Sequence, residues 1–390
     1  MNAKKWTISF VSLIALCLVF IMAANYFIDP FGYFRAQGGD CYTLNERYYL
    51  REVKAQHLKH FSDQYDAYLI GGSKAGALRT EKLKELDGYR YYNAWELSGN
   101  FQDYYYYSKY IIENCKPKKI LLHISTSEIK RFNREGVGDI YEIPAEITGE
   151  AKVPEVFEFL FKNLSASIDE IKLRNNPNDK IYPCYKTGER NLEKYYDVYK
   201  TNKPGYYDFL FKEQVDEYLP FLVNGPKDKS YPVARSIEVL KEIKRLCDEN
   251  NVELQVFIGS VFLGEQIFFE GPSYYSFLEQ IVQITGGVWT FNTYNDIMKN
   301  PFNYYNAYHY LYETGDLMID NMTGKQKTEN FGEYLTMDNV AAHIEKRKET
   351  FKEIKDYYIK NGQLPYLGYD DASNYMANEK DNFTDMNNIK

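Results

Sequence analysis

Ser73 stands where a hydrolytic nucleophile would be expected in this sequence. It follows an apolar run, 68–70, and two glycines, Gly71 and Gly72. The apolar run predicts a buried strand, and the glycines permit a tight turn into a helix beginning near Lys74. N–H groups at the start of that helix would stabilise an oxyanion developing beside the hydroxyl. Because serine is also a frequent helix N-cap, this pattern alone leaves both a nucleophile and a cap open.

A serine nucleophile needs a general base, and the chain has five histidines. His57 and His60 lie three apart, as expected for exposed positions on one helix face. His123 is expected to be a core residue of an apolar strand, and His343 is expected on the charged C-terminal helix. His309 differs, because it comes late in the chain, just before an apolar helical stretch, and could reach the same sheet edge as Ser73. Ser73 and His309 are therefore the predicted nucleophile and base.

The elements that must position these residues alternate between strands and helices. Five strand candidates are found: Ala67–Ile70, Arg90–Asn93, Lys118–Ser125, Val252–Phe262 and Gly287–Phe291. Nearly continuous apolar strands between amphipathic helices predict an α/β fold with a parallel sheet covered on both faces. In such a sheet ligands bind at the carboxyl ends of the strands, which is where Ser73 falls.

The N-terminus predicts a membrane segment. Lys4 and Lys5 precede an uncharged run over residues 6–28, which is long enough to cross a bilayer as a helix. The lysines favour a cytoplasmic N-terminus and an exported remainder. An uncleaved single-pass anchor is favoured over a cleaved signal peptide. The alternative stays open because Ala23 and Ala24 supply small residues near a cleavage site.

The chain is expected to have three parts. These are a cytoplasmic stub and transmembrane anchor over 1–28, an ectodomain over 29–368, and a polar, disordered tail over 369–390. An insertion at about 132–231, rich in Tyr, Asn, Lys and Pro, interrupts the α/β alternation. Long segments of this kind are usually functional or act as lids, although simple decoration is an alternative.

Composition excludes some classes of function. The net charge is −8, so no basic surface argues for nucleic acid. The five cysteines include no C-x-x-C pair, and no cluster has metal-ligand spacing, so neither a metal nor another cofactor is predicted. The 39 tyrosines suit stacking on sugar rings, or reflect a composition bias that fills half-buried positions.

These blocks resemble the SGNH (GDSL-like) hydrolase superfamily. The resemblance lies in the Gly-Gly-Ser block after the first strand, the late "NAYH" block followed by Tyr, Gly and Leu, and the α/β alternation. More narrowly, the chain is similar to membrane-anchored, extracytoplasmic members associated with lipoteichoic-acid D-alanylation and exopolysaccharide O-acetylation. The segment "FIDPFGYF" just outside the anchor is similar to those proteins as well. The resemblance covers roughly residues 26 to 360.

The resemblance implies an SGNH-like three-layer sandwich with a central parallel sheet and assigns roles to individual residues. Ser73 would be the nucleophile and His309 the general base. The backbone N–H groups of Ser73 and Gly99 would form the oxyanion hole.

Two positions depart from the family pattern. Asn306 stands where an acidic residue is expected three before the histidine, and Ser125 and Thr126 are the nearest substitutes for an asparagine after the third strand. An asparagine can present the wrong imidazole tautomer, and in a serine protease this exchange costs roughly 10⁴ in kcat, about 5 kcal/mol. Three alternatives stay open: a Ser–His dyad, another acid such as Asp296 or Asp316, and a site that only binds.

The resemblance implies a membrane-anchored, extracytoplasmic serine esterase or O-acyltransferase acting on cell-envelope polymers. Its substrates would be O-acyl groups of polysaccharide or teichoic acid. The alternative is a catalytically weak or inactive accessory protein that binds a polymer or a membrane-bound O-acyltransferase. The two differ in whether Ser73 and His309 lie within hydrogen-bond reach.

Overall fold

The structure is a computed structural model. It describes residues 3–35, 50–129, 142–150, 152–162, 164–175, 185–192, 196, 222, 232–362 and 364–365. The predicted tail at 369–390 lies outside these residues, as does most of the predicted insertion at 132–231.

The chain forms two compact units. The first combines Met1–Ser62 with Gly136–Lys186, and the second combines Asp63–Glu135 with Thr187–Lys390. The division falls elsewhere than the predicted boundaries, because the end of the N-terminal helix and the residues after it bond to residues 155–167. The two units are described separately.

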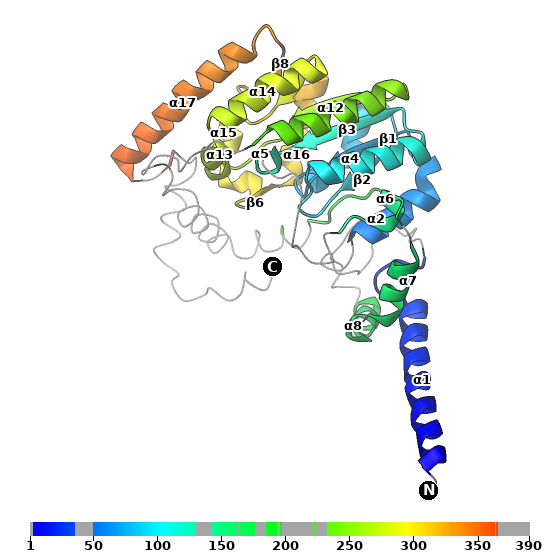
Figure 1. Ribbon diagram of the computed structural model, residues 1–390. Helices are drawn as coiled ribbons and strands as arrows, with labels where there is room; N and C mark the ends of the chain where they lie inside the picture. Colours follow the sequence, from blue (N-terminus) through cyan, green and yellow to red (C-terminus); the bar gives the residue numbers. More distant parts are fainter. Residues whose placement is uncertain are drawn as a thin grey trace. The chain divides into compact units, whose positions relative to one another are not determined.

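Six described strands of the second unit form one sheet in the order β2-β1-β3-β4-β5-β8 (Figure 1). They are β1 (Ala67–Gly71), β2 (Tyr91–Trp95), β3 (Lys119–Ile124), β4 (Glu253–Ile258), β5 (Val288–Thr290) and β8 (Glu333–Leu335). The first five are parallel, and β8 pairs antiparallel with β5 at the edge. The α/β fold with a mostly parallel sheet is thus confirmed.

The five predicted strands are all present. β1 and β3 bury every one of their residues, which is why their apolar runs were readable in the sequence. β8 was not predicted, nor was the hairpin of β6 (Tyr304–Asn306) and β7 (His309–Tyr310). These strands have only two or three residues each and no apolar run.

The described α-helices of the second unit lie between the strands of this sheet in sequence and after its last strand. They are α3 (Thr80–Leu83), α4 (Phe101–Tyr110), α5 (Thr126–Ile129), α12 (Ala234–Glu249), α13 (Leu263–Phe269), α14 (Pro272–Thr285), α15 (Asp296–Lys299), α16 (Tyr312–Thr323) and α17 (Val340–Asn361). α4, α12 and α14 lie side by side along one face of the sheet, and α17 contacts α14 (Figure 1). α12 buries Ile237, Leu240 and Ile243, the apolar residues at helical spacing.

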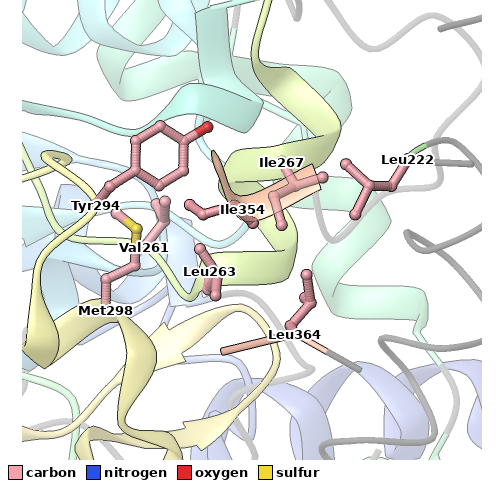
Figure 2. Close-up of a cluster of buried hydrophobic side chains, with 8 residues drawn as sticks. All are labelled: Leu222, Val261, Leu263, Ile267, Tyr294, Met298, Ile354 and Leu364. Carbon is pink, nitrogen blue, oxygen red and sulfur yellow. The ribbon is translucent and has the colours of Figure 1, made fainter. Parts of the chain in front are cut away.

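A cluster of buried apolar side chains holds α17 to the rest of the unit (Figure 2). Ile354 of α17 lies with Leu263 and Ile267 of α13, and Met298 of α15 belongs to the same cluster. The full set is Leu222, Val261, Leu263, Ile267, Tyr294, Met298, Ile354 and Leu364. The charged helix predicted near the C-terminus is therefore part of the core on one side.

A buried ion pair joins α17 to the segment after α13. Arg347 donates two hydrogen bonds to the Glu270 carboxylate, Nη2 to Oε2 at 2.6 Å and Nε to Oε1 at 3.3 Å. The guanidinium also lies over the rings of Tyr274 and Tyr294, each 4.9 Å from the ring centroid. Burial acts to raise the pKa of Glu270, but Arg347 and other hydrogen-bond donors outweigh it and hold that pKa below its usual value.

The first unit begins with α1 (Ala3–Ile28), which is long and apolar enough to cross a membrane. The same length and composition also suit a signal sequence. The other described helices of this unit are α2 (Leu50–Phe61), α6 (Ala145–Thr148), α7 (Lys152–Phe161) and α8 (Leu164–Asn175).

The C-terminal end of α1 is bonded to α7 and α8. Asn25 is buried, and its Nδ2 donates to the carbonyls of Leu160 and Lys162 at 3.0 and 2.7 Å. Its Oδ1 accepts from the Ser167 hydroxyl at 2.9 Å. These two carbonyls belong to the C-terminal end of α7, where a helix has no internal donors.

The Arg347–Glu270 pair gives a prediction for stability. Arg347→Met leaves the Glu270 carboxylate buried without its cation and should lower the free energy of unfolding by ~3–5 kcal/mol. Thermal unfolding of the detergent-solubilised chain measures the change. The double variant Arg347→Met/Glu270→Leu should lose less, and a double variant as unstable as the single one would contradict this account.

Candidate functional site

Ser73 lies at the point where the strand order of the sheet reverses. The chain passes from β1 to β2 on one side of it and then returns to place β3 on the other side. Ligands in open α/β sheets bind at the carboxyl ends of the strands beside such a reversal. Ser73 follows β1 by two residues, and Ser125 directly follows β3.

Glycines allow two backbone segments to meet beside the serine. A Cβ on Gly99 would lie 2.9 Å from the Gly72 Cα, and a Cβ on Gly72 would lie 2.2 Å from the Glu128 Oε1. Both positions therefore require glycine. The contact brings Gly99, the predicted oxyanion-hole residue, against the turn that carries Ser73.

The helix expected to begin near Lys74 is replaced by a short turn, so that prediction was wrong. A 3₁₀ turn covers Ala75–Ala77. The chain leaves the turn at Leu78, whose backbone is extended, with φ −88° and ψ 114°. The Asn93 Nδ2 donates to the oxygens of Ala75 and Leu78 at this exit, at 2.8 and 2.9 Å. The helix dipole expected at Ser73 is therefore reduced to a single turn.

Ser73, His309 and Asn306 form a hydrogen-bonded chain. The Ser73 Oγ lies 2.7 Å from the His309 Nε2, and the His309 Nδ1 lies 2.9 Å from the Asn306 Oδ1. The β6–β7 hairpin supplies both ring and amide, since Asn306 ends β6 and His309 begins β7. The structure therefore brings together residues 236 positions apart in sequence within the distance that a nucleophile and a base require.

Asn306 fixes the tautomer of His309. Besides the ring, its Oδ1 accepts the backbone N–H groups of Tyr308 and His309, both at 2.9 Å. Two backbone donors require that the oxygen of the amide, not its NH₂ group, faces the imidazole. The ring must then carry its proton on Nδ1, which leaves Nε2 free to accept the proton of Ser73. The tautomer problem raised by an asparagine at this position does not arise here.

The surroundings of His309 disfavour its charged form. Burial is the main cause of a pKa well below the ordinary value, and the nearby cations Arg190 and Lys74 lower it further. Asn306 brings no negative charge to oppose them. His309 is thus a neutral but weak base.

Arg190 and Tyr305 line the histidine. The Tyr305 ring stacks on the His309 ring, with centroids 5.3 Å apart and planes 11° from parallel. Arg190 Nη1 donates to the Tyr305 hydroxyl at 2.6 Å, and its guanidinium also lies 5.5 Å from the centroid of the Trp95 ring. Arg190 was not predicted as a site residue, because it lies in the predicted insertion at 132–231, where the strand–helix pattern is lost.

A buried lysine, Lys74, lies next to Ser73 in the sequence and forms an ion pair. The Lys74 Nζ pairs with the Glu265 Oε1 at 3.0 Å, and the hydroxyls of Ser125 and Ser127 lie 3.5 and 3.4 Å from it. The Glu128 carboxylate accepts the Ser125 N–H at 2.7 Å, and burial raises the pKa of Glu128. Sequence reasoning missed Lys74 and Glu265, since α13 lies far from Ser73 in the chain.

The predicted oxyanion-hole groups differ in their bonding. No described residue accepts a hydrogen bond from the Ser73 N–H, whereas the Gly99 N–H donates to the Glu96 carbonyl at 3.1 Å. Ser125 and Thr126 are fully buried, and the Thr126 hydroxyl has no hydrogen-bond partner among the described residues. Of these groups, the Ser73 N–H is the one immediately available to an oxyanion.

The two aspartates considered as substitutes for Asn306 bond elsewhere. Asp316 pairs with Arg79, and Asp296 with Lys299 at 3.5 Å. Since Asn306 already occupies the Nδ1 side of His309, the described residues support a Ser–His–Asn arrangement.

The remaining histidines have other environments. His123 is a buried core residue, as predicted; burial and Lys74 lower its pKa to about 3. His343 in α17 pairs with Glu333 at 2.8 Å. His57 was expected to be exposed, which is wrong, because α2 is buried from Leu50 to Leu58; His60 is exposed.

Within the described ranges, no group of three or more His, Cys, Asp or Glu could hold a metal ion.

Comparison with known proteins does not identify a family for this chain, because no family model and no curated protein matches the sequence.

The state of His309 is directly measurable. An ordinary histidine has a pKa of about 6.5 and is half protonated at pH 6.5. In NMR spectra of the full chain with labelled histidine, the His309 ring should instead be neutral at this pH, with its proton on Nδ1. Asn306→Asp places a carboxylate against Nδ1 and should raise the pKa of His309 towards or above that value. A wild-type ring that titrates near 6.5 and does not respond to Asn306→Asp would contradict the assignment. Single His→Gln variants identify the five signals.

Proposed function

We propose that this protein is a serine-dependent acyl-transfer enzyme, an esterase or O-acyltransferase, with Ser73 as the nucleophile. The Ser73–His309–Asn306 hydrogen-bonded chain at the sheet's reversal point is the observation that carries the proposal. The 2.7 Å separation of Oγ and Nε2 is the geometry of an activated serine.

The chemistry follows from the positions of these atoms. Ser73 Oγ attacks the carbonyl carbon of an ester while His309 Nε2 takes its proton, and the resulting oxyanion receives the Ser73 N–H. The tetrahedral intermediate then expels the alkoxide, which takes the proton from Nε2 and leaves an acyl-serine. Water or an acceptor hydroxyl then attacks this acyl group with His309 again as the base, and the second tetrahedral intermediate expels the Ser73 Oγ, which takes the proton back from Nε2. Asn306 holds the ring but adds no charge.

The proposed substrates lie in the cell envelope. With α1 as an anchor and a cytoplasmic N-terminus, the second unit would work outside the membrane on polymers held near its surface. O-acyl groups of polysaccharide or teichoic acid fit this location and the SGNH-like resemblance of the Ser73 and His309 blocks. The three-layer arrangement of that superfamily is part of the same proposal, and a membrane-bound O-acyltransferase is the proposed source of acyl groups.

A binding or accessory role is the second candidate. Three observations favour it: the uncharged partner of His309, the two cations beside the ring, and the Gly99 N–H bonded to Glu96. The first two disfavour the imidazolium that forms when His309 takes the proton, and the third leaves the oxyanion with one donor fewer.

Active-site labelling decides between the two. The full chain in detergent should react with a fluorophosphonate probe, and Ser73→Ala and His309→Ala should each abolish the reaction, because the first lacks the nucleophile and the second its base. Ser276→Ala on α14 is the control and should label as the wild type does. Absent labelling of the folded wild-type chain would contradict the enzyme and favour the accessory role.

Asn306 gives a prediction for the pH dependence of the reaction. His309 must be neutral to act as a base, and its pKa lies below the ordinary histidine pKa of about 6.5. The value of kcat/KM for p-nitrophenyl acetate should therefore stay constant to well below pH 6.5. Asn306→Asp should move the acid limb to higher pH and raise the rate above it by ~10-fold or more, because a carboxylate stabilises the imidazolium. An unchanged acid limb in this variant would exclude His309 as the base.

A further inference from the structure

α7 has apolar side chains on two opposite faces. On its inner face Phe159 is buried against Phe31 and Tyr33, and the Tyr33 and Phe159 rings stack with centroids 4.2 Å apart. On its outer face Val153, Phe157 and Phe161 are 66 %, 53 % and 44 % exposed. Large apolar side chains left exposed in a row on one helix usually mark a surface that contacts a membrane or another protein.

Exposed apolar side chains lie on both α7 and α8. Val153, Phe157 and Phe161 recur every four residues, which places them in one row, and the last two rings stack. α8 adds Ile168 and Ile171, which are three apart and about half exposed. We call this set of five residues the outer stripe, and no described part of the chain covers it.

Hydrogen bonds hold the outer stripe beside the end of α1. Asn25 of α1 bonds to Leu160 and Lys162 at the end of α7 and to Ser167 in α8, in each case through its side chain. A buried polar group in an apolar helix is costly unless it is bonded, so these contacts fix both helices at that level of α1. Along α1 itself, Phe20 and Phe27 are also exposed.

We propose that α7 and α8 lie in the lipid–water interface next to α1, with the outer stripe among the acyl chains of the bilayer. The residues around the stripe are those of an interface. Arg35 lies over the Tyr26 ring, 5.5 Å from its centroid, and donates to the Phe27 carbonyl at 2.9 Å. Lys162 lies over Phe159 and pairs with Glu158 at 2.5 Å. Aromatic rings and basic side chains gather at this depth of a membrane.

The source of the affinity is apolar contact rather than charge. Over residues 152–174 the four acidic residues are matched by four basic ones: Glu155, Glu158, Asp169 and Glu170, with Lys152, Lys162, Lys172 and Arg174. A surface of this kind has no excess of positive charge to attract anionic lipid, so insertion to ~5–10 Å should occur in zwitterionic lipid as well. The inference depends on α1 being in the bilayer and not on the chemistry of Ser73.

Photo-crosslinking tests the position of the two helices. The full chain carries p-benzoylphenylalanine in place of Phe157 or Ile168, is reconstituted in phosphatidylcholine vesicles and is irradiated; mass spectrometry then identifies the adducts. Leu16, exposed in the middle of α1, is the lipid-facing control, and Tyr357, exposed on α17, is a control aromatic from the second unit. Circular dichroism confirms that each variant keeps its helix content.

We expect lipid adducts at positions 157 and 168 to be several-fold more abundant than at 357 and similar to those at 16. Adducts at 157 and 168 no more abundant than at 357 would overturn the proposal. Crosslinks to a second copy of the chain in place of lipid would overturn it as well and identify a protein interface. Absent adducts at 16 would remove its premise, since α1 would then lie outside the bilayer.

Discussion

The candidate site depends on one oxygen atom. The Asn306 Oδ1 accepts three N–H groups, two from the backbone of the hairpin and one from the His309 ring. The backbone pair holds the amide in one orientation, and that orientation decides which ring nitrogen carries the proton. Without it the ring could offer Nε2–H to Ser73, and the serine would have no base. A residue type that normally signals impaired catalysis is thus compatible with a correctly oriented base.

The orientation of the ring is separate from its charge. A carboxylate would both orient His309 and stabilise the imidazolium; the amide orients it only, while Arg190 and Lys74 oppose protonation. The two cations have a compensating use, because positive charge beside Ser73 favours an oxyanion. Lys74 is held by Glu265 from α13, so this positive charge is partly neutralised and its position is fixed by the fold. In the proposed reaction, His309 is therefore a weaker base, but more positive charge lies near the reacting carbonyl.

The sequence predicted what depends on local pattern. Buried strands have apolar runs on both faces, so β1 and β3 were found, and Ser73 and His309 followed from their places relative to the strands. What depends on a few hydrogen bonds was not predictable. The chain becomes extended at Leu78, whose carbonyl accepts from the Asn93 side chain, and the β6–β7 hairpin has too few residues to show a strand period. Lys74, Glu265 and Arg190 reach the site from distant segments, and nothing in their own neighbourhoods indicates it.

Because of the hydrogen bonds of Asn25, removal of the N-terminal helix would also affect the structure of the first unit. The four residues before it, 21–24, are half-buried, and its own side chain closes the end of α7. Cutting after Ala24 would replace an internal helical residue with a charged amino terminus beside three buried hydrogen bonds. A form of the chain shortened at residue 28 would lose those bonds and leave two carbonyls of α7 without their donor. Solubility gained by such a deletion would come with a loosened first unit, so the segment acts as a structural part of that unit as well as a hydrophobic one.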